Sequence, residues 1–539
     1  MSESEGRERG ARGVMVLAAS NLLVKAAGLF FKIPMNYAVG DAGMGYYNAA
    51  YSVYALLYTL STAGLPVALS VMIAEQRARG NLRGAEQTCR RTLALLFLLG
   101  CAGCAFLWVG AGPIAGAIRS PESAHAVRAV APALLFICVS SAMRGWFQGC
   151  GRMTPTAFSQ LAEAVGKLIF GIGAALYAVR RGYSTSIAAA YAASGLSVGS
   201  FCGMVYLLIL RRIGRAGAER DLPGETAPLG RTLSGLTKIA LPVTLSASVM
   251  SLSSAMDTMS VQRILIASGT SAEDAAALFG NYTSLAVPMF NLPPALIYPF
   301  AYALVPAAAA ALASGRRDEA AERIERTMRI ALFIGIPCAC GLAALSDPIL
   351  CLLFRDSSAH RAAPLLTLLA PASCLVCLTA ATNAGLQASG GQRLSLCAMA
   401  AGAAVKWIAG ELLLPVCGIP GAPLSTAASY LTVTALNLVF LKRRTSAALS
   451  FRRTLSPLLS GILCGASARW ICAGLTPILG NSAAVPLSIA AAALVYFALL
   501  CLTGGFGEAE KALLARLIPA DLLYRIRFRG AGRMKQERI

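Results

Sequence analysis

Nine charged side chains in or beside the long apolar segments of this 539-residue sequence are candidates for a polar site, and six of the nine are positively charged. A charge in such a segment is costly inside a membrane, so it usually faces a partner or a water-filled cavity. The excess of ammonium and guanidinium groups suits the binding of an anion such as a phosphate or pyrophosphate group. The cationic residues are Lys25, Lys32, Arg144, Lys167, Arg263 and Lys406, and the anionic residues are Glu163, Asp257 and Glu411.

Some of these charges can neutralise one another. Glu163 and Lys167 are one helical turn apart, which predicts an ion pair between them. Lys406 and Glu411 are five residues apart and therefore less well aligned. Even with every anion paired, about three positive charges would remain without a protein partner.

We expect the unpaired cations to bind substrate in a cavity, with the carboxylates as their acidic partners. The alternative for Lys32, Arg144 and Arg263 is that these side chains, near the ends of their segments, extend to the membrane surface. The expected substrate-binding residues are Lys25, Lys32, Arg263, Lys167 and Lys406, and the acidic partners are Asp257, Glu163 and Glu411.

The composition places the chain among polytopic membrane proteins. It is 57% hydrophobic and only 13% charged, with a mean hydropathy of +0.64, whereas soluble domains are about 25% charged. The net charge of +22 would suit a nucleic-acid binder, but the basic residues lie in short clusters between apolar runs. We therefore expect no nucleic-acid partner.

Apolar runs of about 20 residues predict transmembrane helices, and fourteen such runs are present. With both termini cytoplasmic, 33 of the 47 Lys and Arg residues fall on the inner side and six fall in outer loops, as the positive-inside rule requires. The predicted spans lie near 14–36, 45–74, 92–111, 127–148, 153–179, 185–210, 234–262, 275–306, 328–347, 362–386, 394–414, 418–441, 455–476 and 483–503.

The two ends of the chain raise separate questions. A cleaved signal peptide is the alternative for the first 30 residues, but the apolar run continues past Lys25 to Ile33 and its removal would spoil the charge asymmetry. From Glu510 onward, Leu and Ile recur along a basic segment, which predicts an amphipathic helix on the anionic inner membrane surface.

The two halves of the sequence repeat. Residues 113–125 (PIAGAIRSPESAH) match 348–360 (PILCLLFRDSSAH) at an offset of 235. We interpret the shared Ser-Ala-His as a helix start, and a pH-sensing role for His125 and His360 is the alternative. The repeat predicts the domains 1–13 (cytoplasmic N-terminus), 14–210 (N-lobe), 211–233 (inter-lobe loop), 234–441 (C-lobe), 455–503 (two further spans) and 504–539 (basic tail).

Transporters built from repeats bind substrate at the repeat interface, which favours a carrier over a channel or an anchored enzyme. Proline-rich breaks in the second and eighth spans would suit hinges, and packing irregularity is the equal alternative. The hinge candidates are Pro66, Pro288, Pro293, Pro294 and Pro299.

The 16 cysteines do not form a disulfide framework, because most lie inside apolar runs. Cys101-x-x-Cys104 and Cys374-x-x-Cys377 have the spacing of metal ligands, but this spacing also joins ordinary neighbours on a helix. With two His in the whole chain, we interpret these cysteines as small buried apolar residues and predict no metal site.

Residues 20–70, SNLLVKAAGLFFKIPMNYAVGDAGMGYYNAAYSVYALLYTLSTAGLPVALS, resemble the opening of the polysaccharide-transport branch of the MOP (multidrug/oligosaccharidyl-lipid/polysaccharide) exporter superfamily. Within it they are most similar to the stage V sporulation protein B group of Gram-positive bacteria, relatives of MurJ-type lipid II flippases. Residues 236–265, with Pro242, Asp257 and Arg263, are similar to the opening of the second lobe.

This resemblance implies a V-shaped pair of lobes around a central cavity and export of undecaprenyl-pyrophosphate-linked sugars by alternating access. It implies a groove for the lipid tail along the last two spans, and cationic cavity residues matching Lys25, Lys32 and Arg263. The two first-span positions carry Lys where Arg is typical, so bidentate phosphate contact is lost there.

We therefore predict a flippase for a polyprenyl-pyrophosphate-linked glycan, most simply a peptidoglycan precursor, in a bacterial plasma membrane. Its partners would be that anionic lipid, the surrounding membrane lipids and cell-wall synthesis proteins; no cofactor is expected beyond a coupling ion or the membrane potential. The nearest alternative is an exporter of another lipid-linked polysaccharide. A drug/cation antiporter is disfavoured because the first span has no carboxylate, and a glycosyltransferase because the outer loops are short.

Overall fold

The computed structural model describes residues 3–62, 64–215, 224–225, 228–354, 356–447 and 451–503; within helices, the side chains of 3–26 and of some later residues, mostly between 242 and 254, are outside the description. All regular structure in this part of the chain is helical. Eleven helical stretches in it are long and apolar enough to cross a membrane. The all-α polytopic membrane fold is thus confirmed, and the count of fourteen spans and the lobe boundaries stay predictions. The predicted basic tail and the side chain of Lys25 lie outside the described residues.

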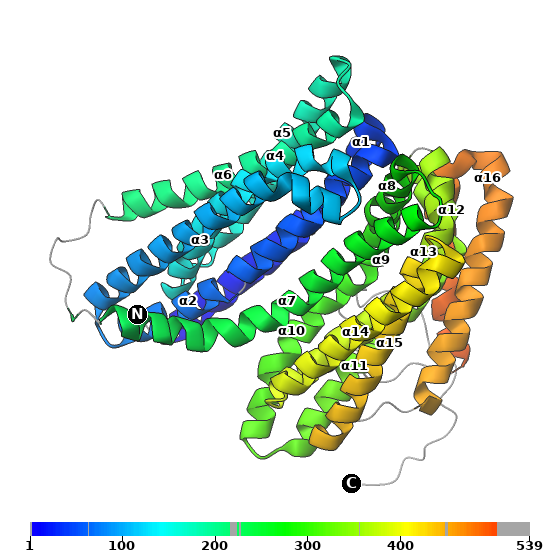
Figure 1. Ribbon diagram of the computed structural model, residues 1–539. Coiled ribbons are helices and arrows are strands. Elements are labelled where there is room, and N and C mark those ends of the chain that lie inside the picture. Colours follow the sequence, from blue (N-terminus) through cyan, green and yellow to red (C-terminus); the bar gives the residue numbers. More distant parts are fainter. Residues whose placement is uncertain are drawn as a thin grey trace, which may run out of the picture. The chain divides into compact units, whose positions relative to one another are not determined.

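One compact unit contains the chain up to Leu285 together with Lys406–Ala422. In it α4 packs against α3 and α6, α5 packs against α6, and α1 contacts α4, α5, α7 and α8 (Figure 1). Its helices are α1 (Glu3–Thr62), α2 (Leu65–Ala78), α3 (Leu82–Ala117), η1 (Pro121–Ser123), α4 (Ala124–Gly149), α5 (Thr154–Arg180), α6 (Thr185–Arg215), α7 (Leu229–Ala267), α8 (Ala272–Asn281), most of η2 (Tyr282–Ala286) and the second half of α14 (Gln392–Cys417).

The other unit contains Ala286–Val405 and the chain from Pro423 onward. Here α11 packs against α13, α10 contacts both of them, and α16 lies along α11 (Figure 1). Its helices are α9 (Val287–Phe290), α10 (Leu292–Ala313), α11 (Arg317–Ala344), α12 (Ser346–Leu353), α13 (Asp356–Ala388), the first half of α14, nearly all of α15 (Gly421–Thr445) and α16 (Phe451–Leu502).

A glycine interrupts each of the two longest helices. Gly40 in α1 has a φ of 71° and Gly480 in α16 has a φ of 69°, in the left-handed region that other residues rarely adopt. Both glycines have open space around the position of a Cβ, so the backbone angle and not crowding requires glycine there. Each break falls in the short gap between two predicted spans.

The proline-rich segments break helices where the sequence predicts. Pro66 lies in the first turn of α2, just after Gly64, and Pro288 lies in the first turn of α9. Pro293 and Pro294 open α10, whereas Pro299 lies within it. Since Pro has no N–H to donate, the first turn is where a helix tolerates it best. The hinge role of these residues stays a prediction.

The repeated Ser-Ala-His motifs both lie at helix starts. His125 is the second residue of α4, and His360 lies in the opening turns of α13. The helix-start interpretation of this motif is therefore confirmed for both copies.

Small residues bring α5 and α6 close together. A Cβ added at Gly199 of α6 would meet the carbonyl oxygen of Glu163 and lie 2.7 Å from the backbone nitrogen of Lys167. Both are backbone atoms of α5 and cannot turn aside. This close packing of small residues is typical of membrane helices, and here it fixes the α5 backbone that carries Glu163 and Lys167.

Gly199→Ala is expected to destabilise the protein by about 1–3 kcal/mol, because the added methyl group must push two helices apart. The matched control is Gly173→Ala, since Gly173 of α5 has open space at its Cβ position and alanine favours a helix. The midpoint of thermal unfolding in detergent should fall for the first variant and hold or rise for the second. Equal midpoints would contradict this packing.

Candidate functional site

Each of the three predicted intramembrane carboxylates is paired with a basic residue from another helix. All six residues belong to the unit that contains α1–α8. The pairs are Arg144–Glu163 at 2.8 Å, Lys406–Asp257 at 2.5 Å and Arg263–Glu411.

The predicted ion pair between Glu163 and Lys167 is wrong. The Arg144 guanidinium of α4 donates to Glu163 at 2.8 Å and, through Nε, to the Ser159 hydroxyl at 2.9 Å. The Arg144 side chain is only 8% exposed and the Glu163 side chain 25%. A buried guanidinium without a partner is strongly destabilising. Arg144 therefore pairs with Glu163, the carboxylate that was predicted to pair with Lys167 of the same helix.

Two further pairs join α7 to α14. Asp257 binds Lys406, with side chains 20% and 13% exposed, while Arg263 binds Glu411 in a more exposed pair. Lys406 and Glu411 are about 7.5 Å apart along the axis of α14, since each residue adds about 1.5 Å. Lys406 and Glu411 therefore contact α7 at different positions along its axis and do not pair with each other.

Lys32 and Lys167 remain without a carboxylate partner among the described residues. The Lys32 Nζ donates a hydrogen bond to the backbone carbonyl of Thr283 at 2.7 Å. The Lys167 Nζ lies 4.7 Å from the ring centroid of Phe31 and 5.3 Å from that of Tyr51, which are cation–π distances. Both lysines therefore contact neutral groups, and neither forms a salt bridge within the described part of the chain.

The helix break after α8 explains why the Thr283 carbonyl is available. Thr283 lies in the π-helical segment η2, where each carbonyl accepts from the residue five positions later. For Thr283 that residue is Pro288, which has no N–H. Next to it, the Asn48 side-chain amide donates to the Ser284 hydroxyl at 2.5 Å. The break thus turns a backbone dipole toward Lys32 in α1.

A stripe of four tyrosines continues from this place along α1. Tyr47, Tyr51, Tyr54 and Tyr58 follow one another at spacings of four, three and four residues, with successive ring centroids 6.0–6.3 Å apart. Phe31 packs against the first ring at 5.6 Å. The helical spacing of these tyrosines is visible in the sequence and is a signal that could have identified them.

The structure therefore divides the predicted site residues into two groups. Lys406 and Arg263 are engaged with their acidic partners, whereas Lys32 contacts a backbone carbonyl and Lys167 contacts aromatic rings. Lys25 lies outside the described side chains. We name the second group, Lys32 and Lys167 with Phe31, Tyr47 and Tyr51, the cationic aromatic site.

The Asp257–Lys406 pair makes a stability prediction. Asp257→Asn or Lys406→Met alone is expected to destabilise the protein by about 3–5 kcal/mol, because each leaves one largely buried charge unpaired. The double variant is expected to recover most of that loss, as measured by thermal unfolding in detergent. Additive losses in the double variant would show that the two residues do not act as a pair.

The polysaccharide biosynthesis protein family matches residues 11–311 of this chain. Three proteins of Bacillus subtilis (strain 168) are similar over most of their length. They are the uncharacterized membrane protein YabM (28% identical, 90% of each chain), the lipid II flippase MurJ (25% identical, 80% of this chain and 82% of MurJ) and stage V sporulation protein B (26% identical, 96% and 97%).

Solved structures agree on the fold. The lipid II flippase MurJ in an inward closed conformation matches with a TM-score of 0.71 at 13% identity, over 91% of this chain and 98% of that structure. An inward-facing MATE family multidrug transporter of the MOP superfamily matches with a TM-score of 0.64 at 15% identity, over 79% and 94%. The chain therefore belongs to the polysaccharide biosynthesis protein family.

Proposed function

We propose that this protein is a flippase that moves a polyprenyl-pyrophosphate-linked glycan, specifically lipid II, from the inner to the outer leaflet of a bacterial plasma membrane. The observation that carries the proposal is the cationic aromatic site, in which two lysines have no carboxylate partner among the described residues. The relatives named as a lipid II flippase and as a sporulation protein support a lipid-linked glycan as the class of substrate.

A pyrophosphate group fits the charge of this site. An anion that contacts both ammonium groups would gain two charge-assisted hydrogen bonds and neutralise two positive charges. The effect is larger in a membrane protein, where the low dielectric strengthens each interaction. A lysine is a point charge without a fixed fork geometry, so the site would tolerate the rotation of a flexible phosphate linkage.

The tyrosine stripe supports the proposal that the substrate carries a glycan. A tyrosine has an apolar face and a hydroxyl tip, a combination that suits sugar rings, whose C–H faces are apolar and whose edges carry hydroxyls. Tyr51, at 40% exposed, offers its ring to a ligand more readily than the buried Tyr47 and Tyr54 do. The stripe would guide the sugars while the lysines bind the pyrophosphate.

The ion pairs argue against a cationic drug as cargo. Such a cargo requires a carboxylate that is not neutralised, and Glu163, Asp257 and Glu411 are each paired with Arg or Lys. The proposed activity is transport alone, in which no covalent bond is made or broken. The helix breaks at Pro66 and at Pro288–Pro294 are the proposed hinges of an alternating-access cycle, coupled to an ion or to the membrane potential. Cell-wall synthesis proteins are the proposed protein partners.

The direct test is translocation of fluorescent lipid II in proteoliposomes, with a neutral lipid of the same tail as control. Lipid II alone should become accessible on the opposite leaflet. Movement of another lipid-linked pyrophosphate glycan in place of lipid II would correct the glycan but not the class. Equal movement of the neutral lipid, or no movement of any pyrophosphate lipid, would contradict the flippase proposal.

Variants of the lysines test the proposed site. Lys32→Met and Lys167→Met are each expected to lower the rate of translocation by about 10- to 100-fold, the loss of one hydrogen bond to a charged group. The matched control is Lys238→Met, since Lys238 is an exposed lysine of α7 that does not belong to this site. Lys25→Ala should also lower the rate and Lys25→Arg should preserve it. Unchanged rates for Lys32→Met and Lys167→Met would remove both residues from the site.

A further inference from the structure

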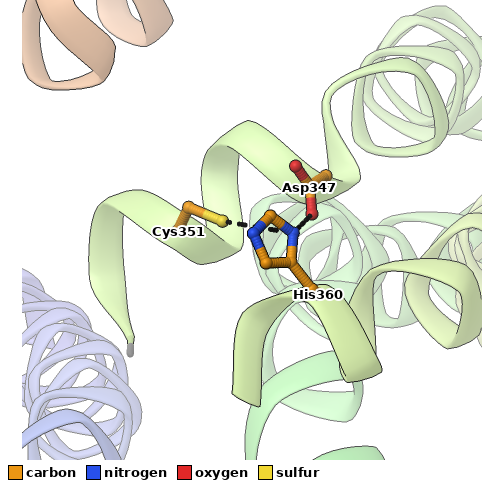
Figure 2. A group of neighbouring side chains, drawn as sticks. All are labelled: Asp347, Cys351 and His360. Carbon is orange, nitrogen blue, oxygen red and sulfur yellow. Dashed lines mark hydrogen bonds and ion pairs between the residues drawn. The ribbon is translucent and has the colours of Figure 1, made fainter. Parts of the chain in front are cut away.

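Three side chains that can ligate a metal converge where α12 meets α13, in the unit that contains Ala286–Val405. Figure 2 shows Asp347 and Cys351 on α12 facing His360 of α13. The His360 Nδ1 lies 2.6 Å from an Asp347 carboxylate oxygen and 4.0 Å from the Cys351 Sγ. The three potential ligand atoms all lie within 4.8 Å of one another.

The local fold brings these side chains together. Asp347 and Cys351 are four residues apart on α12, so they share one face of the helix. Phe354 then adopts an extended conformation (φ −127°, ψ 174°), which ends α12 abruptly and allows α13 to begin beside it. A hydrogen bond of 2.7 Å between the Ser346 and Thr367 hydroxyls also joins the two helices. His360 therefore faces Asp347 and Cys351 from the neighbouring helix.

We propose that Asp347, Cys351 and His360 bind a divalent ion of the zinc class. Thiolate, imidazole and carboxylate are the protein ligands of Zn²⁺, at about 2.0–2.3 Å each. Two ligands on a tetrahedral ion of this size are about 3.4 Å apart, and the observed separations of 2.6 and 4.0 Å lie on either side of that value. Small side-chain rotations would complete the geometry, and a water molecule would occupy the fourth position.

The internal repeat provides a comparison within the same chain. At the offset of 235, the counterparts of Asp347 and Cys351 are Gly112 and Gly116, whereas the counterpart of His360 is His125. The histidine thus occurs at both helix starts, whereas the other two potential ligands occur only in the second copy. The second copy has the complete set, so a metal site explains Asp347 and Cys351 where the helix-start role does not. This proposal replaces the expectation from the sequence that the chain has no metal site.

The test is metal binding by the purified full-length protein in detergent. After chelation and reloading with ZnCl₂, the wild type should retain one zinc per chain through desalting. Co²⁺ loaded in its place should give the visible absorption of a tetrahedral ion with a thiolate charge-transfer band. Cys351→Ser should remove that band, and Cys351→Ser and His360→Ala should each weaken zinc binding by at least about tenfold.

Matched controls separate this site from other thiols and from folding defects. Cys397→Ser changes an exposed cysteine outside the cluster, and His125→Ala changes the histidine of the first repeat; both variants should bind metal as the wild type does. Gel filtration checks that each variant is folded, and Asp347→Asn replaces any variant that is not. Equal zinc retention by the wild type and Cys351→Ser, or a Co²⁺ spectrum without a thiolate band, would overturn the proposal.

Discussion

A charged side chain inside a membrane must find a partner, and the unit that contains α1–α8 is built around this constraint. Three carboxylates are each neutralised by a basic residue from a different helix, so the ion pairs connect α4 to α5 and α7 to α14. Removal of either partner would leave a charge that the surroundings cannot solvate. These ion pairs therefore neutralise the three carboxylates, and Lys32 and Lys167 are left without a carboxylate partner among the described residues.

The proposed binding of a pyrophosphate depends on these two lysines. Lys32 and Lys167 are held by a backbone carbonyl and by aromatic rings, which orient an ammonium group without cancelling it. The helix break at η2 and Pro288 frees the carbonyl, and the close contact at Gly199 fixes the backbone of Lys167. Pro288 and Gly199 thus both help to position the cationic aromatic site.

The sequence predicts which charged residues lie in the membrane helices better than it predicts which of them pair with each other. Apolar runs and basic loops are local properties, so the helical membrane fold and the breaks near Gly40, Pro66 and Pro288 could be read from them. The surplus of cations over carboxylates also follows from a count. Which cation pairs with Glu163 could not be predicted, because Arg144 reaches it from a neighbouring helix. The spacing of the four tyrosines predicts that they share one face of a helix. The approach of His360 to Cys351 could not be predicted in this way, because it depends on the turn at Phe354.

The proposed transport depends on the binding of a pyrophosphate group by Lys32 and Lys167. The most direct measurement is the affinity of the purified protein for undecaprenyl pyrophosphate and for undecaprenyl monophosphate, in the wild type and in the Lys32→Met/Lys167→Met variant. The wild type should prefer the pyrophosphate, and the double variant should lose that preference while its unfolding midpoint is preserved. An equal preference for pyrophosphate in the two proteins would contradict the claim.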